Sequence, residues 1–301
     1  MEWLVLFAII IAWIVGIVAV LALVGFTYQL IAEKRDNRVQ PGESVSVSGR
    51  NMHLLCLGEQ DGPTIILEAG GSNSSITSRK IQSDIAKFAR VCAYDRAGYG
   101  FSDPVNHSRT FDEIAEDLDE LLTQAGVVLL DAAEEEHTFG RLQKLKGMQS
   151  TAATTSWLAR FGVVRLLLNL VPEKAGIPAD ISPERRREIV GEYSRPEFFK
   201  SAVHELEAYF STPQQLRKSG GFGSLGSTPL IVVKHGKPLT GSQAFLEEGW
   251  SEAQARLAAL STDSNLLVAE QSGHAISLDQ PELVVDLVRS LVEKITTRVT
   301  L

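Results

Sequence analysis

The residue with the clearest catalytic potential is His274, which follows Gly273 just after an apolar segment near the end of the chain. In this position its imidazole is expected to be exposed, and it can accept a proton near neutral pH. Asp131, at the end of another apolar segment, is the first carboxylate that could orient it, and Glu247 and Glu248 are the alternatives. A histidine oriented by a carboxylate is the general base that activates a serine for attack on an ester. A loop histidine that only makes hydrogen bonds is the competing interpretation.

Short apolar segments alternating with helical patterns are predicted to position these residues. A hairpin is expected first, because two extended runs flank Gly49-Arg50. Alternation of strands and helices indicates a mostly parallel sheet with helices on both faces. The expected strands span residues 44–48, 51–58, 62–71, 90–95, 127–131, 228–236 and 265–270, and the expected helices span residues 81–88, 111–126, 243–260 and 281–294.

A long helix-rich stretch interrupts this alternation between about residues 134 and 218. One of its helices is predicted to begin at Ser182 and Pro183, because serine is a favoured N-cap and proline a favoured first helical residue. We interpret the stretch, with its flanks to about residue 226, as a helical cap inserted in the α/β domain.

Three motifs in a fixed order carry a family resemblance. They are LEAGGSNSS at Leu67–Ser75, CAYDRAGYGFSDP at Cys92–Pro104 and SGHAISLDQPELV at Ser272–Val284. Together they resemble the oxyanion loop, a mainly structural loop and the histidine loop of the α/β-hydrolase fold family. The resemblance covers about Val47 to Lys294 and is closest to membrane-associated bacterial hydrolases.

The resemblance implies hydrolysis of an ester-type bond, with backbone N–H groups near Gly70, Gly71 and Ser72 stabilising the oxyanion. It implies His274 as the base and a small apolar, ester-like or lipid-like ligand. It implies no cofactor and no metal. The remaining histidines, which we assign to strand, loop or helix-surface positions without a role, are His53, His107, His137, His204 and His235.

The nucleophile of this family is missing from the sequence. Gly-x-Ser-x-Gly, the strained turn that presents the serine, does not occur, and Ser224 lies in a glycine-rich loop before a strand rather than after one. Gly126 is followed directly by Val127, where a central strand, the turn, a helix and a return loop of roughly 30–40 residues are expected. The unit is therefore interpreted as deleted. Residues 127–131 must shift toward the gap or leave backbone groups unpaired.

Three functions remain open from the sequence. The first is an inactive or truncated hydrolase in which His274 is a relic base. The second is a non-catalytic binding or scaffold protein for an apolar ligand. The third is an active hydrolase with Asp131 as a carboxylate nucleophile, which is disfavoured because Leu129 and Ala133 replace the glycines of the turn.

The amino terminus is predicted to be a membrane anchor. Trp3 to Thr27 contains no charged residue and is long enough to span a bilayer as a helix. A cleaved signal peptide is disfavoured because no Lys or Arg precedes the run. Residues 1–33 are assigned to the anchor, 34–43 to a linker and 44–298 to the hydrolase-like domain. The basic residues after the anchor, Lys34, Arg35 and Arg38, predict a single-pass protein with its globular part in the cytoplasm.

Composition excludes one class of partner and bears on the cysteines. A formal net charge of -8 argues against a nucleic-acid-binding protein. The two cysteines, Cys56 and Cys92, each lie in a short apolar run, so we interpret them as small core residues rather than as a disulfide or metal site.

Overall fold

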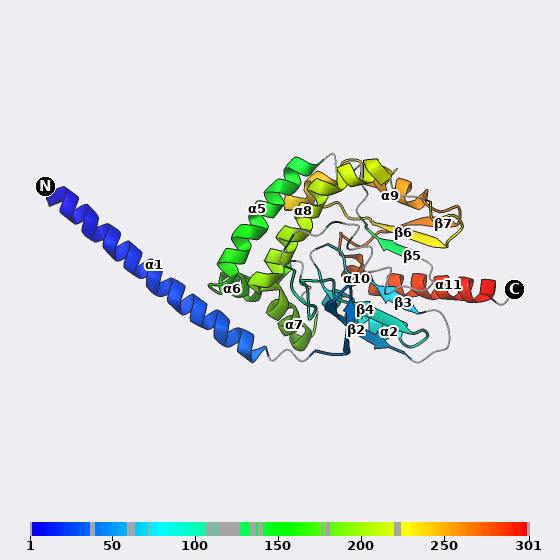
Figure 1. The fold of residues 1–301 in the computed structure, drawn as a ribbon, viewed down its shortest axis with the longest axis horizontal. Coiled ribbons are helices and arrows are strands. Elements are labelled where there is room, and N and C mark those ends of the chain that lie inside the picture. Colours follow the sequence, from blue (N-terminus) through cyan, green and yellow to red (C-terminus); the bar gives the residue numbers. More distant parts are fainter. Residues whose placement is uncertain are drawn as a thin grey trace. The chain divides into compact units, whose positions relative to one another are not determined.

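The computed structural model contains two compact units, one of residues 1–39 and 150–200 and one of residues 40–149 and 201–301. Each unit is described by itself (Figure 1). The residues that the structure describes are 2–36, 40–58, 64–71, 73–105, 107, 110, 113, 127–132, 137, 141–175, 177, 181–219 and 224–299.

The first unit, which we call the helical unit, combines the amino-terminal helix with helices from the middle of the chain. It holds α1 (Glu2–Arg35), α6 (Val163–Leu170), the 3₁₀ helix η2 (Pro172–Ala175), α7 (Pro183–Tyr193), most of α5 (Leu142–Ala159) and the start of α8 (Pro196–Ser219).

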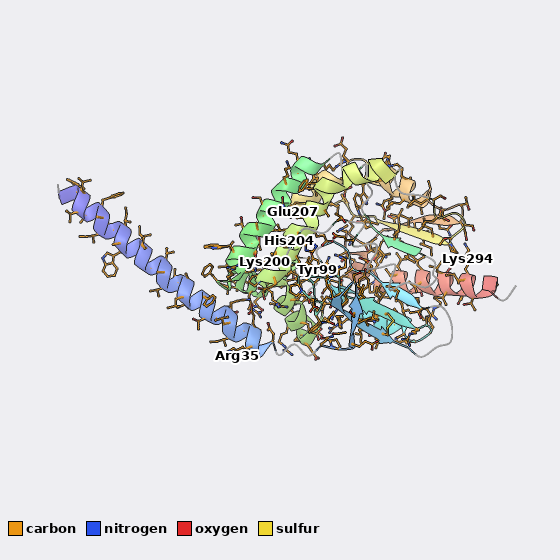
Figure 2. All side chains as sticks on the ribbon, viewed as in Figure 1. Arg35, Tyr99, Lys200, His204, Glu207 and Lys294 are labelled. Atoms are coloured by element: carbon orange, nitrogen blue, oxygen red, sulfur yellow. A yellow bond between two sulfur atoms is a disulfide. The ribbon has the colours of Figure 1, made fainter. Side chains whose placement is uncertain are left out.

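Two predictions about these helices can be compared with the structure. Helix α7 begins as predicted, because the Ser182 side chain accepts a hydrogen bond from the backbone N–H of Arg185 and Pro183 is the first helical residue. Helix α1 is long and apolar enough to cross a membrane, and a signal sequence would meet the same criterion. Figure 2 shows its side chains projecting on all sides of the helix.

The second unit, which we call the sheet unit, holds seven described strands in two sheets. The first sheet has the order β1-β2-β4-β3 and the second the order β5-β6-β7. The predicted hairpin is confirmed, since β1 and β2 pair antiparallel. The strands are β1 (Glu43–Val47), β2 (Arg50–Leu57), β3 (Ile65–Leu67), β4 (Val91–Tyr94), β5 (Val127–Leu130), β6 (Leu230–His235) and β7 (Ser264–Ala269).

The two sheets are not joined by any strand that the structure describes. Strands β3 and β4 are parallel, and β5, β6 and β7 are parallel, but no described strand joins β3 to β5. Strand β5 has not shifted to pair with β3. Among the described residues, the outer edges of β3 and β5 have no strand partner.

One hydrophobic core nevertheless serves both sheets. Val91 of β4 and Ile231 and Val233 of β6 lie in the same buried cluster, and side chains of β3 and β5 pack against it. Helices α2 (Arg79–Ile85) and α11 (Pro281–Val299) supply many of the other residues of this cluster. Apolar packing rather than a continuous hydrogen-bond ladder therefore connects the two sheets.

The helices of the sheet unit also differ in part from expectation. The helix expected over residues 243–260 is a 3₁₀ helix, η3 (Gly241–Leu246), followed by α9 (Trp250–Ala258), because Gly249 adopts a left-handed conformation between them. The helix expected over residues 111–126 lies outside the described residues. At its expected start, Thr110 and Glu113 form reciprocal capping hydrogen bonds.

The interpretation of the cysteines was wrong. Cys56 and Cys92 form a disulfide with a Cα–Cα distance of 4.0 Å. The reason is register: the two residues lie directly opposite each other on the antiparallel strands β2 and β4. Disulfides persist in oxidising compartments, so this bond and the basic residues that follow the apolar run make opposite predictions for the location of the sheet unit.

Candidate active site

The predicted acid and base lie at the carboxyl ends of the parallel strands of the second sheet. Asp131 follows β5 directly, and its positive φ of 47° turns the chain away from the strand. His274 lies in the loop between β7 and the short helix α10 (Ile276–Asp279). Carboxyl ends of parallel strands share one edge of a sheet, which is where open α/β folds carry their sites.

Side chains of the following residues hold the histidine loop in place. The Asp279 carboxylate accepts a hydrogen bond from the backbone N–H of Gly273 at 2.9 Å. The Gln280 amide oxygen accepts bonds from the Ser272 hydroxyl at 3.1 Å and from the backbone N–H of Gln271 at 2.9 Å. These bonds fix the backbone on the amino-terminal side of His274.

The structure brings His274 and Asp131 together. Nδ1 of His274 lies 2.7 Å from Oδ2 of Asp131. With Nδ1 donating to the carboxylate, Nε2 is the nitrogen that can accept a proton. The His274 side chain is 46% exposed, and its Nε2 makes no hydrogen bond with any residue that the structure describes. This is the arrangement that a general base requires.

The Asp131 carboxylate is shared with a second histidine and a tryptophan. The ring Nδ1 of His235 lies 2.7 Å from Oδ2 and 2.8 Å from Oδ1, and the backbone N–H of His235 donates to Oδ1. The indole N–H of Trp250 donates to Oδ1 at 2.7 Å. Asp131 is 1% exposed, so these donors replace the water that its carboxylate has lost.

The donors around Asp131 determine its protonation. Burial alone would raise the pKa of this carboxyl group, but the hydrogen bond from His274 and those from the backbone and ring of His235 outweigh burial. The pKa of Asp131 consequently lies below its usual value. The carboxylate is therefore charged at neutral pH and can orient His274 and stabilise its protonated form.

The same contacts argue against Asp131 as a nucleophile. Both of its oxygens accept hydrogen bonds, and it contacts Nδ1 of His274, the nitrogen that an orienting acid contacts. A carboxylate nucleophile needs an oxygen that is free to approach a substrate. The positive φ of Asp131 is compatible with the left-handed conformation that aspartate tolerates better than most residues.

The two alternative acids have other partners. The Glu247 carboxylate lies 2.9 Å from Nε2 of His235 and also accepts the backbone N–H of Leu239. The backbone carbonyl of Glu248 accepts bonds from His137 and Arg141. Neither glutamate contacts His274 through an interaction between described residues. Glu247 orients His235, which in turn contacts Asp131.

The predicted oxyanion loop is held through its carbonyl groups. The Gly70 carbonyl accepts hydrogen bonds from Arg96 at 2.9 Å and from the backbone of Asn73 at 3.2 Å. Neither Gly70 nor Gly71 donates its backbone N–H to another residue that the structure describes. Ser72 lies outside the described residues.

The second motif, Cys92–Pro104, forms a buried hydrogen-bond network around Asp95 and not a reactive group. Asp95 accepts hydrogen bonds from the backbone of Ser75 at 2.7 Å, the backbone of Phe101 at 3.0 Å and the His53 ring at 2.7 Å. Burial raises the pKa of Asp95, but these bonds lower it by more. Gly100 has a φ of 55°, and a Cβ there would lie 2.0 Å from the Asp95 carboxylate. The glycine is needed because the carboxylate occupies that space.

Several residues of this network were not found from the sequence. His53 and His235 lie on strands, a position that was expected, but these two histidines and His137 are buried and were assigned no role. Trp250 was not considered. The one available signal for His235 is its place at the end of an apolar strand, at the edge where Asp131 was expected. Ser224, as expected, lies exposed in a loop, where its hydroxyl donates to the carbonyl of Leu260.

The described residues contain no group of three or more His, Cys, Asp or Glu side chains that could hold a metal ion.

Sequence comparisons find a bacterial protein that is similar over most of the chain. No protein-family model matches the chain. A protein of Bacillus subtilis (strain 168), named "Uncharacterized protein YqjL", is 27% identical over 249 residues, which is 80% of this chain and 88% of that protein.

Solved structures resemble the chain more broadly, at low identity. A Vigna radiata epoxide hydrolase mutant has a TM-score of 0.63 at 14% identity and covers 84% of this chain and 98% of its own. The Cif epoxide hydrolase from Acinetobacter nosocomialis has a TM-score of 0.63 at 14% identity, with 89% and 96% covered. A thermophilic esterase from Thermogutta terrifontis has a TM-score of 0.55 at 15% identity, with 84% and 98% covered. These similarities show that the chain has the α/β-hydrolase fold.

Proposed function

We propose that this chain is a membrane-anchored pseudo-enzyme, descended from α/β-hydrolases that cleave ester-type bonds but without such activity itself. The supporting observation is an acid–base pair without a nucleophile. His274 and Asp131 lie 2.7 Å apart, while Gly-x-Ser-x-Gly is absent from the sequence. In active relatives of this fold, that histidine removes the serine proton and later protonates the leaving group.

Turnover of short activated esters such as p-nitrophenyl acetate is expected to stay at the background rate, with His274→Ala unchanged from the parent. Triad members act as a unit, so a histidine without a serine contributes almost nothing to the rate. Initial rates of the full chain, its His274→Ala variant and a buffer blank provide the measurement. Esterase activity that disappears in His274→Ala would contradict the proposal and require another nucleophile.

Labelling with a fluorophosphonate is an independent test for an activated serine in the same sample. The reagent modifies activated serines covalently, and mass analysis of peptides locates the modification. We expect no modified residue. Modification of one serine that requires an intact His274 would identify an active hydrolase instead.

For the anchor, we expect the full chain to sediment with membranes and to remain there in alkaline carbonate. Helix α1 can cross a bilayer with its charged residues outside the apolar run, and such a helix is extracted by detergent only. The measurement is an immunoblot of supernatant and pellet. Intact chain in the carbonate supernatant would show that α1 is no anchor.

For orientation, we propose that the sheet unit faces the cytoplasm, because the basic residues Lys34, Arg35 and Arg38 follow the apolar run. Protease added to intact cells should then leave it undigested. The disulfide allows the opposite orientation to be tested. If protease added to intact cells digests the sheet unit, and if Cys56 and Cys92 react with maleimide only after reduction, the sheet unit lies outside the cytoplasm.

A further inference from the structure

Helix α6 of the helical unit buries its charged residue and leaves several large apolar residues exposed. Its charged residue, Arg165, is buried at 5% exposure. Val164 and Leu168 are buried with it, but the other large apolar residues face outward, and Leu170 at 67% is the most exposed of them. A surface helix normally buries its apolar stripe and turns its charges to water. We call the outward set the α6 face; it consists of Val163, Leu166, Leu167, Leu170 and Val171.

The buried arginine attaches α6 to α1. The Arg165 guanidinium donates to both Asp36 carboxylate oxygens, at 3.1 and 2.7 Å, and to the Gln29 side-chain oxygen at 3.2 Å. The Gln29 amide in turn donates to the Ser194 carbonyl at 3.0 Å. A bidentate arginine–carboxylate pair is geometrically specific, so α6 is fixed against the last turns of α1.

Close contacts between α1 and the turn before α6 fix the position of α6 along the length of α1. A Cβ added at Gly25 would lie 2.3 Å from the Phe161 carbonyl oxygen, and one added at Gly162 would lie 2.7 Å from the Tyr28 ring. Phe161 and Gly162 form the turn between α5 and α6. This turn therefore lies against the last residues of the apolar run, which ends at Thr27.

The end of α5 adds residues that suit a membrane–water interface. Trp157 is 59% exposed and packs on Phe161 with ring centroids 4.8 Å apart. Arg160, next to them in the sequence, is exposed as well. Tryptophan and basic residues concentrate at bilayer interfaces, where an aromatic ring contacts acyl chains and a guanidinium contacts headgroups.

We propose that the α6 face and Trp157 lie in the surface of the same lipid bilayer that α1 crosses. The partner is the bilayer and not a second protein, because the α6 face continues the exposed apolar surface of α1 at the level where the run ends. A helix of 8 residues is too short to span a bilayer, so α6 lies along the interface. The inference rests on the proposed anchor and is independent of catalysis.

Tryptophan quenching by lipids brominated on their acyl chains tests the proposal on the full chain in vesicles. A background with Trp3→Phe and Trp13→Phe keeps Trp157 and the buried Trp250. We expect shallow bromines to reduce its emission more than deep ones. Adding Trp157→Phe should remove the quenching, because Trp250 is buried in the sheet unit. A second background, Trp3→Phe with Trp157→Phe, reports the anchor through Trp13, which deep bromines should quench.

A paired variant tests the face itself. Leu166→Gln with Leu170→Gln changes two exposed side chains, so the fold should tolerate it. We expect weaker quenching of Trp157 and unchanged quenching of Trp13. Arg187→Gln, at an exposed position of α7, is the matched control and should leave both signals unchanged.

The outcomes separate the two proposals. Quenching of Trp13 without quenching of Trp157 would overturn the interfacial α6 face and leave the anchor intact. Quenching of neither would show that the anchor itself is absent. Trp157 emission that ignores bromines but changes with protein-to-lipid ratio would assign the α6 face to a second copy of the chain, which also overturns the proposal.

Discussion

Insertion of a strand–Gly-x-Ser-x-Gly–helix unit between Gly126 and Val127 is expected to create esterase activity and raise the melting temperature together. The acid–base pair is already assembled, and Nε2 of His274 has no described partner. A serine delivered to that nitrogen would complete the triad. The rate should exceed that of the parent chain by about 10²-fold or more, the lower end of what a positioned general base contributes.

The stability gain has a separate cause. Strands β3 and β5 each lack a described partner on one side, and an inserted strand can pair with both. A parallel crossover needs about a dozen or more residues, which Gly126 to Val127 does not provide. Each unpaired buried backbone group costs roughly 1–3 kcal/mol, against about 5–15 kcal/mol for a whole domain. We therefore expect the parent chain to melt at low temperature or to aggregate.

Two matched variants of the inserted chain separate these effects. Replacing its new serine by alanine should abolish ester turnover and keep the higher melting temperature. His274→Ala in the same chain should also abolish turnover. A parent chain that melts cooperatively at high temperature would show that its strand edges are satisfied in another way. If the insertion raises neither the rate of ester turnover nor the melting temperature, the missing unit does not belong between Gly126 and Val127.

Local sequence signals predicted the local structure well. Gly49-Arg50 between two extended runs predicted the hairpin, and Ser182-Pro183 predicted the start of α7, because turns and caps depend on neighbouring residues. The order of three motifs predicted the fold. The deletion inferred between Gly126 and Val127 stays a prediction.

Tertiary contacts were less predictable. The pairing of Cys56 with Cys92 depends on the register of β2 against β4, which no short pattern determines. His235 and Trp250 reach Asp131 from positions more than a hundred residues away along the chain, 104 and 119 residues respectively. The contact between Asp131 and His274 was suggested by the family resemblance, while its additional donors were not. Short sequence patterns do not show which residues far apart in the chain come into contact.

Asp131→Asn is expected to be the most destabilising single substitution at the site. The side-chain amide has one accepting oxygen in place of two, and its NH₂ group would face donors from His235, His274 or Trp250. Leaving buried donors unpaired costs roughly 1–3 kcal/mol each, so a loss of about 3 kcal/mol or more is expected. Urea unfolding of the full chain in detergent, followed by intrinsic fluorescence, measures the loss. Glu247→Gln, which changes a more exposed partner of His235, should cost less.

Lowering the pH should reduce the difference in unfolding free energy between the Asp131→Asn variant and the parent chain. Because the folded-state pKa of Asp131 is lowered, its charged form stabilises the fold fully above the unfolded-state value of about 3.9. This contribution is lost as pH falls through the folded-state pKa, since the protonated carboxyl group no longer attracts His274 and His235. The asparagine variant has no such contribution to lose. Its unfolding free energy should therefore approach that of the parent chain as pH falls below about 4. A difference that stays constant from pH 7 down to pH 3 would show that the charge of Asp131 does not stabilise the fold.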